Sequence, residues 1–482
     1  MSNLSELLPT GGGQNAVDFV ASGTLSSGQA VILKTDGTIE AVVETAAGAG
    51  SPSVFESASI QYSATTYDST NSKVVIAYSD GGNSNYGTAV VGTVSETSIS
   101  FGTPVVFESA TSRYISATYD STNSKVVIAY TDVEDSFRGK AVIGTVSGTS
   151  ISFGAIAEFN SGITQFVSAT YDSTNNKVVI AYMDESNSSY GTAIVGTVSG
   201  TSISFGSEVL FKSAYSAYVS ATYDSANNRV VIAFQDGGNS DYSTAVVGTV
   251  SGTSISFGTA VVFNSATSTS NSATYDSANN KIVIAYRDAG NLNYGTAIVG
   301  TVSGTSISFG AEVVFENANS SFMSATFDSG SNKIVIAYAD QGNSAHGTAV
   351  IGTVSGTSIS FGSPSIFESA NVNHISTTYD SSNNKVVINY MDGGNSNYGT
   401  SVVFQTTASS NSADFIGITA EAISDTATGP VNVYGGINEA QTGLTIGSNY
   451  YVQNDGSLST TASSVKVGQA ISATTINMMD LT

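Results

Sequence analysis

The chain lacks cysteine and tryptophan altogether, and its 482 residues include 5 prolines and 2 histidines. Without cysteine there is no disulfide framework and no thiol chemistry, so packing and hydrogen bonds alone hold the fold together. Charged residues make up 11% of the chain, well below the roughly 25% of an average domain.

Basic residues are scarce as well: 14 Lys and Arg stand against 37 Asp and Glu, for a formal net charge of −23. A nucleic-acid partner needs basic clusters that neutralise phosphates, and the sequence shows none. The same balance argues against docking on anionic lipid. No stretch approaches the roughly 18 apolar residues of a membrane helix, and Met1–Pro9 lacks the basic and apolar regions of a secretory signal. We therefore expect no nucleic-acid partner, no membrane insertion and no signal peptide.

A seven-fold repeat dominates what the sequence does contain. An aromatic-Asp-Ser tripeptide recurs every 52 residues, with its aspartates at Asp68, Asp120, Asp172, Asp224, Asp276, Asp328 and Asp380. Each repeat holds four β-prone runs separated by turns rich in Gly, Asn and Ser. Four antiparallel strands in about 50 residues make one propeller blade. A β-solenoid is the competing repeat architecture, but its coils are usually shorter and lack hairpin turns within the repeat.

The two ends of the repeat array complement each other. The segment 52–58 before the first repeat matches 104–110, the fourth strand of a blade, whereas the last repeat stops after its third strand, Thr400–Gln405. A ring closed by the N-terminal strand satisfies both ends and leaves no open edge. The sequence therefore predicts an all-β fold with a seven-bladed propeller of four-stranded blades at residues 51–406.

The flanks, residues 1–50 and 407–482, do not carry the repeat. Each contains a strand, an Asp-Gly turn and a second strand, at Ala30–Ile39 and at Tyr450–Leu458. We predict that they form one small split β domain into which the propeller is inserted, with 45–51 and 406–412 as linkers. Two separate disordered tails are the alternative, which the β-rich patterns of 414–423 and 465–476 disfavour.

The seven copies differ from one another in two segments, 55–63 and 79–87 with their equivalents. These connections share one face of a propeller, here called the variable face. The uniform Asp-Ser-x-x-Asn-Lys and Ser-Gly-Thr-Ser turns share the opposite, constant face. A framework stays uniform while a recognition surface diverges; drift in unconstrained loops is the alternative.

Two sets of side chains on the variable face are the candidate ligand-binding residues. The first set precedes the innermost strand and comprises Tyr62, Tyr114, Phe166, Tyr218, Phe322 and His374, with Ser270 in the fifth copy. Polar residues beside it are Gln61, Arg113, Gln165 and Asn373. The second set opens the third strand and comprises Tyr86, Arg138, Tyr190, Tyr242, Tyr294, His346 and Tyr398. Aromatic rings stack on apolar sugar faces and fill interface pockets; capping of each blade's core is the alternative.

Two rings of aspartates have structural explanations. Asp68 and its six equivalents fit Asx turns with an ion pair to the Lys or Arg five residues on. The second ring fits capping of loop backbone and comprises Asp80, Asp132, Asp184, Asp236, Asp288, Asp340 and Asp392. The loop 80–85 lacks the spacing and the closing Glu of an EF-hand. We predict no metal and no cofactor.

Catalytic patterns are weak. Glycosidases need an asymmetric pair of carboxylates, and a sialidase-like site also needs clustered arginines, whereas the arginines of the repeats are dispersed. Near-identical blades suit a multivalent binder, which gains by avidity. We therefore predict that the protein is not an enzyme.

Phrases in the flanks resemble a known group of proteins. The segments Gly443–Thr461, Val465–Ser472 and Leu8–Asn15 are similar to segments of virion structural proteins of tailed phages, especially marine ones. In that group such proteins are tail fibres, receptor-binding tips or capsid decorations, and they are often trimeric. The resemblance implies a virion protein, made in the host cytoplasm, whose terminal β domain binds other virion proteins and whose propeller is displayed. It also implies a homo-oligomer, with a trimer favoured.

The leading prediction from the sequence is thus a phage virion surface protein. Its propeller would attach to a host surface glycan or to a neighbouring virion protein without catalysis. A bacterial lectin-like adhesin and a glycan-cleaving depolymerase are the alternatives.

Overall fold

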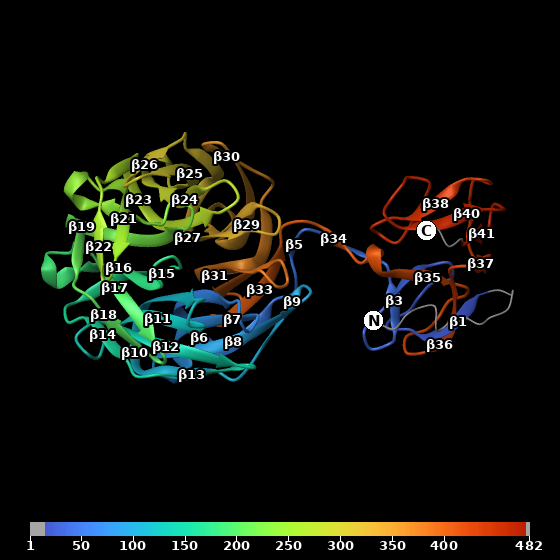
Figure 1. The fold of residues 1–482 in the computed structure, drawn as a ribbon, viewed down its shortest axis with the longest axis horizontal. Helices are drawn as coiled ribbons and strands as arrows, with labels where there is room; N and C mark the ends of the chain where they lie inside the picture. The colour runs from blue at the N-terminus through green and yellow to red at the C-terminus, as the bar shows by residue number, and fades with distance from the viewer. Residues whose placement is uncertain (1–14, 479–482) are drawn as a thin grey trace. The chain divides into compact units, whose positions relative to one another are not determined.

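The computed structural model describes residues 15–478 and divides into two compact units (Figure 1). One unit is formed by residues before Gly48 together with residues after Thr406, and the other is Gly48–Thr406. Regular structure in the described range consists of β-strands and short 3-10 turns. None of the helices within that range is long and apolar enough to span a membrane.

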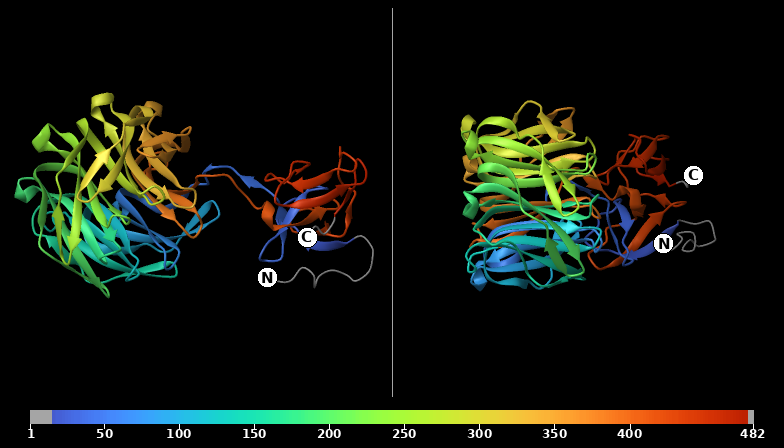
Figure 2. Two further views of the ribbon diagram at one scale, coloured as in Figure 1. Left: turned by 45° about the horizontal axis from the view of Figure 1, so that its top comes forward. Right: turned by 60° about the vertical axis from the view of Figure 1, so that its left-hand side comes forward.

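The larger unit is a ring of seven blades, each an antiparallel sheet of four strands (Figure 2). The outermost strand of one blade runs on into the innermost strand of the next. These long strands are β6 (Ser53–Asp68), β10 (Val105–Asp120), β19 (Val209–Asp224), β23 (Val261–Asp276), β27 (Val313–Asp328) and β31 (Ser365–Asp380), with β14 (Ala157–Asn160) and β15 (Thr164–Asp172) replacing one of them.

The remaining strands of the blades keep the same repeat. The second strands are β7 (Lys73–Asp80), β11 (Lys125–Asp132), β16 (Lys177–Asp184), β20 (Arg229–Asp236), β24 (Lys281–Asp288), β28 (Lys333–Asp340) and β32 (Lys385–Asp392). The third strands are β8 (Tyr86–Ser95), β12 (Arg138–Ser147), β17 (Tyr190–Ser199), β21 (Tyr242–Ser251), β25 (Tyr294–Ser303), β29 (His346–Ser355) and β33 (Tyr398–Gln405). Short outer strands are β9 (Ser98–Phe101), β13 (Ser150–Phe153), β18 (Ser202–Phe205), β22 (Ser254–Phe257), β26 (Ser306–Phe309) and β30 (Ser358–Phe361).

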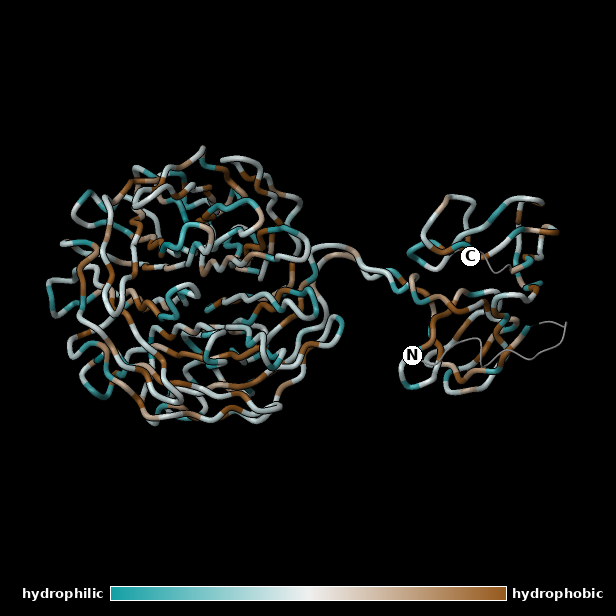
Figure 3. The backbone as a smooth tube through the Cα atoms, viewed as in Figure 1, coloured by the Kyte–Doolittle hydropathy of each residue, from teal (hydrophilic) through white to brown (hydrophobic). Residues whose placement is uncertain are grey.

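Hydrophobic side chains from neighbouring blades form the core of the ring. The second strands are buried on both faces, as their continuous apolar runs predict. Phe107, on the outer strand of the first blade, contacts Tyr130 and Phe153 of the second blade at centroid distances of 5.1 and 5.7 Å. Such aromatic pairs contribute about 0.5–1.5 kcal/mol beyond the area they bury. In Figure 3 the hydrophobic stretches follow the strands, while hydrophilic stretches mark the connecting loops.

The ring closes between the two ends of the repeat array. The first half of β6 pairs with β33, the third strand of the last blade, with Val54 opposite Thr400 and Ser53 opposite Ser401. The short strand β5 (Gly48–Ala49) adds two further pairs to β33. Phe55 on this closing strand is buried against Tyr78. The N-terminal strand that the sequence left over is thus paired with the third strand of the last blade.

Turns and hydrogen bonds on the constant face repeat from blade to blade. Asp68 Oδ1 accepts from the backbone N–H groups of Thr70 and Asn71, and the other six aspartates make equivalent Asx turns. The predicted ion pair between Asp68 and Lys73 is not formed, because Lys73 Nζ donates to Thr93 Oγ1 instead. That hydroxyl lies across the hairpin at 2.9 Å, and the Asp68 carboxylate already accepts from two backbone N–H groups and from Asn71 Nδ2.

Serines tie the innermost strands of neighbouring blades together. Ser116 Oγ, for example, accepts from the backbone N–H of Ala169 at 2.9 Å. The serines that make this contact are Ser116, Ser168, Ser220, Ser272, Ser324 and Ser376. The equivalent position in the first blade is Ala64.

The smaller unit is the predicted split β domain. Its first sheet, β1-β36-β35-β2-β3, combines strands from both flanks: β1 (Ala16–Val20), β36 (Thr428–Val433), β35 (Phe415–Thr419), β2 (Ala30–Leu33) and β3 (Ile39–Ala41). Its second sheet has the order β37 (Ile437–Asn438), β41 (Ile476–Asn477), β40 (Lys466–Ala470), β38 (Asn449–Val452) and β39 (Leu458–Ser459). Residues of both flanks share one core. The alternative of two separate disordered tails is therefore wrong for the described residues.

The two hairpins that looked alike in sequence have the same geometry. In each, an aspartate Oδ1 accepts from the backbone N–H two residues on, at 2.9 Å for Asp36 and for Asp455. The following glycine takes φ of 85° in Gly37 and 81° in Gly456, which an L side chain rarely adopts.

The segments predicted as linkers carry short strands. Besides β5, these are β4 (Glu44–Thr45) and β34 (Ser409–Ser410), which pair with each other. A 3-10 turn, η7 (Ser412–Asp414), follows. The phrase Leu8–Asn15 lies, apart from Asn15, outside the described residues.

Candidate ligand-binding face

Strand register brings both predicted sets of side chains to one end of the blades. Ile60 pairs with Asp80, and Asp80 pairs with Tyr86. The Asx-turn residue Asp68 lies at the other end, opposite Lys73. The variable and constant segments therefore occupy opposite faces of the ring.

The first set sits in β-bulges with a left-handed backbone. In the second blade the register between β10 and β11 shifts between Arg113 and Ser116, and Tyr114 inside this bulge has φ of 47°. All seven equivalents have positive φ, from 47° to 55°. A side chain other than glycine costs on the order of 1 kcal/mol or more in this conformation. Bulges re-aim side chains next to functional sites, so strain repeated at this position is a pointer to function.

Six rings of the first set form a continuous arc, here called the aromatic arc. Its order is Phe322, His374, Tyr62, Tyr114, Phe166 and Tyr218, with neighbouring centroids 5.1–5.5 Å apart. Neighbouring ring planes meet at 46–54°, close to the rotation of about 51° between blades of a seven-fold ring. The ring planes therefore run along the axis, and the arc is interrupted at Ser270.

The side chains of the arc pack against the blade cores on one side and are exposed to solvent on the other. Tyr62, Tyr114 and Phe166 pack against hydrophobic clusters of the blades, yet they remain partly exposed. Phe322 is the most open member, with 37% of its surface exposed. Core capping and ligand contact are thus compatible for the same rings.

The polar residues beside the arc differ in their availability. Gln61 and Arg113 are exposed. Gln165 donates through Nε2 to Glu185 and accepts from the Tyr114 hydroxyl at 3.3 Å. Asn373 donates to Asn371 Oδ1 at 3.3 Å.

The second set is half-buried at the start of each third strand. Within the part of the chain that the structure describes, no ring contact joins these residues to one another or to the arc. Arg138 is held by Glu158 at 2.9 Å and by Asp135 at 3.7 Å. The arc and the second set are therefore separate features of one face.

Burial lowers the pKa of His374 to about 4, so the ring is neutral at pH 7. Because the unfolded chain binds a proton with a pKa near 6.5, stability from this residue is present above pH 6.5 and is lost as the pH falls towards 4. We expect the wild-type free energy of unfolding to fall by about 2–3 kcal/mol more than that of His374→Phe between pH 7 and pH 4.5.

This comparison is made by urea unfolding of both proteins at both pH values. Phenylalanine occupies the same bulge in Phe166 and Phe322, so the fold accepts it. The carboxylates that titrate in this range are common to both proteins and cancel. Equal pH dependence of the two would contradict a buried neutral imidazole.

The second ring of aspartates caps the loops that precede the third strands. Asp80 Oδ1 accepts from the Gly82 N–H at 2.9 Å. Five of these loops contain a 3-10 turn, namely η2 (Gly81–Asn83), η3 (Glu185–Asn187), η4 (Gly237–Asn239), η5 (Ala289–Asn291) and η6 (Gln341–Asn343). Among the residues that the structure describes, no group of three His, Cys, Asp or Glu side chains suits a metal ion.

The sequence reasoning missed an acidic cluster under this face. The buried Tyr78 hydroxyl donates to Glu56 at 3.0 Å, and burial together with the charge of Asp80 raises the pKa of Glu56. At the junction of the third and fourth blades, Phe234 stands in place of the tyrosine and Lys212 in place of the glutamate, and Lys212 pairs with Asp236 at 2.5 Å. The tyrosine and the glutamate are thus replaced together, and this paired replacement between repeats is visible in the sequence and could have predicted their contact.

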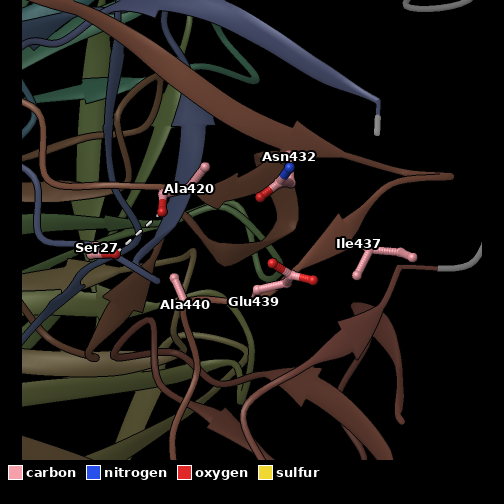
Figure 4. A pocket seen from close by; sticks show the side chains of 6 residues that line it. All are labelled: Ser27, Ala420, Asn432, Ile437, Glu439 and Ala440. Atoms are coloured by element: carbon pink, nitrogen blue, oxygen red, sulfur yellow. Dashed lines mark hydrogen bonds between the residues drawn. The ribbon is translucent and has the colours of Figure 1, made fainter. Parts of the chain in front are cut away.

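The split β domain contains a pocket of its own, of about 300 Å³. It is lined by Ser27, Ala420, Asn432, Ile437, Glu439 and Ala440 (Figure 4). Ser27 donates to the Ala420 carbonyl at 3.3 Å on one side of it. A single carboxylate and an amide offer no catalytic pair, and the pocket lies outside the predicted site.

Comparison with known proteins identifies the fold. No protein-family model and no curated protein matches the sequence. The chain is similar to the BP39L lectin from Burkholderia pseudomallei, with 9% identity over 74% of this chain and 98% of that chain and a TM-score of 0.54. Weaker similarities are to a Dyadobacter fermentans protein of unknown function (11% identity, 80% and 99% coverage, TM-score 0.46) and to the Aleuria aurantia lectin (13%, 64% and 96%, 0.43). At these identities the likeness concerns the fold.

Proposed function

We propose that the protein is a non-catalytic recognition protein that binds carbohydrate at the aromatic arc. The observation that carries this proposal is the arc itself: six rings held in strained bulges around the axis on the face that varies between blades. Aromatic planes with polar groups beside them suit the apolar faces and hydroxyls of sugars. The similarity in fold to a lectin supports the same class of ligand.

Display on a phage virion is the biological setting we propose. It rests on the resemblance of Gly443–Thr461 and Val465–Ser472 to virion structural proteins of tailed phages. The split β domain would then attach the chain to other virion proteins, as a homo-oligomer, and the propeller would contact a host surface glycan. Antibody against the propeller, viewed on particles by negative-stain microscopy, tests this setting, and unlabelled virions would count against it.

The arc is tested by replacing Tyr114 with serine. We expect the affinity for bound glycan to fall about tenfold or more, because one stacking surface is lost. The bulge tolerates serine, since Ser270 has the same backbone conformation. Affinity is measured by isothermal titration with a glycan that binds the wild-type protein on a glycan array.

The matched control is Tyr119→Phe at the other end of the same strand. Tyr119 donates to Thr70 Oγ1 on the constant face, and the equivalent residue in the sixth blade is Phe327. This variant should bind as the wild type does. Loss of binding in both variants, or in neither, would count against the arc. Release of reducing ends from the glycan would instead favour a depolymerase.

A further inference from the structure

The fifth blade departs from the other six on the variable face. Ser270 stands where the other copies have an aromatic ring or histidine. Leu292 stands where all six others have serine, and 72% of its surface is exposed. Arg287 adds a cation at the end of the second strand of the same blade. Three unusual side chains therefore gather at one blade.

Hydrogen bonds and register bring these positions towards Phe322. Arg287 lies opposite Thr269, the neighbour of Ser270, and its Nε donates to Asn319 Oδ1 at 3.0 Å. Asn319 belongs to β27, three residues before Phe322. The carbonyl of Asn293, next to Leu292, accepts from the Ser320 N–H at 3.1 Å. The guanidinium thus lies between the strands that carry Ser270 and Phe322.

Arg287 has no carboxylate partner among the residues described. The other cations of this face that form ion pairs are Arg138, Lys140 and Lys212. Nearby carboxylates are otherwise engaged: Asp288 caps the Gly290 N–H, and Glu316 accepts from the Tyr338 hydroxyl. The Nη1 and Nη2 nitrogens of Arg287 therefore remain for an acceptor from outside the chain.

The interruption of the arc has the width of one ring. Neighbouring members of the arc are 5.1–5.5 Å apart. Two such steps around a seven-fold circle leave roughly 9–10 Å between the centroids of Tyr218 and Phe322, room for one six-membered ring at the spacing and tilt of the other members of the arc. Asn271, whose Nδ2 donates to the Tyr218 carbonyl, and Ser270 provide polar atoms there.

We propose that one pyranose ring completes the aromatic arc at Ser270, between Tyr218 and Phe322, with its oxygens facing Arg287. The inference deepens the proposed function and rests on it: the seven-fold scaffold holds one saccharide per propeller at this position rather than seven equivalent ones. The oxygens that meet Arg287 belong either to hydroxyls or to a uronate carboxylate.

The test places an aromatic side chain at position 270, where the arc is interrupted. Ser270→Tyr introduces a residue that the same bulge holds in Tyr62, Tyr114 and Tyr218. Binding of a panel of neutral methyl pyranosides and methyl uronosides is measured by isothermal titration with the full chain. We expect a stoichiometry of one per propeller for the wild type and about a tenfold or greater loss of affinity in Ser270→Tyr. If the wild type prefers uronosides and Arg287→Ala loses this preference, the group that faces Arg287 is the uronate carboxylate. If the wild type binds both classes equally, hydroxyls face Arg287.

The controls separate this inference from the proposed function. Tyr275→Phe, on the constant face of the same blade, leaves Ser270 and the interruption unchanged and should bind as the wild type does. Ser270→Phe repeats the filled state with the ring of Phe166 and Phe322. The inference alone is overturned if Ser270→Tyr and Ser270→Phe keep the wild-type affinity, or if several sugars bind per propeller, while Tyr114→Ser still weakens binding of the glycan selected on the array. No pyranoside bound by the wild-type protein overturns both.

Discussion

Phe55→Ala is expected to lower the free energy of unfolding by about 3–5 kcal/mol and to open the ring. Phe55 is 6% exposed and contacts Tyr78 and Phe101 at centroid distances of 5.2 and 5.6 Å. It belongs to the strand that closes the propeller, so its loss weakens the junction between the last and first blades. An opened ring has two unpaired strand edges, which pair with other copies.

The control removes the same ring from the middle of the array. Phe263 is 7% exposed and contacts Tyr286 and Phe309 at 5.3 and 5.5 Å. Phe263→Ala should lose a similar free energy in urea unfolding. We expect concentration-dependent dimers in size-exclusion chromatography for Phe55→Ala alone, and equal behaviour of the two variants would show that the closing strand has no special role.

A second large effect is expected at the same junction, where buried polar residues replace alanine. Asn389 and Ser401 are 0% exposed, and the six equivalent positions of each are alanine. Asn389 Oδ1 accepts from the Thr65 hydroxyl, but Asn389 Nδ2 and Ser401 Oγ have no hydrogen-bond partner. Each unpaired buried polar group costs about 1–3 kcal/mol.

We therefore expect the triple variant Thr65→Ala, Asn389→Ala and Ser401→Ala to have a free energy of unfolding about 2–4 kcal/mol higher than that of the wild type. The measurement is urea unfolding of both proteins. The single variant Asn389→Ala should gain less, because it leaves the Thr65 hydroxyl without its partner. A reciprocal control is Ala337→Asn with Ala349→Ser in the sixth blade, which should lose stability. A triple variant less stable than the wild type would mean that the polar groups are satisfied at this junction.

The fold was predictable from the sequence because its information is local and repeated. The 52-residue period, the Asx turns at Asp68 and its equivalents, and the glycine turns each follow from nearest neighbours in the chain. The spare strand at 52–58 predicted closure, because an unpaired edge must find a partner. The matching Asp-Gly hairpins likewise predicted that both flanks are β-structured.

The candidate site was predictable in part. The sequence placed the aromatic residues on the variable face, but not the bulges that hold them, because tyrosine is not a residue one expects at positive φ. Contacts such as Gln165 with Glu185 and Lys212 with Asp236 join different strands and depend on side-chain directions. The polar residues Asn389 and Ser401 are visible as departures from alanine, yet their burial is not.

The sequence by itself determined the number of blades, their turns and the complementary ends of the ring, since these depend on backbone propensity and on a period read along the chain. Only the tertiary structure decided that six rings spaced 52 residues apart touch one another and that the arc stops at Ser270. The physical reason is that ring contacts depend on a bulge, a left-handed backbone and the rotation between blades, none of which is encoded in the spacing.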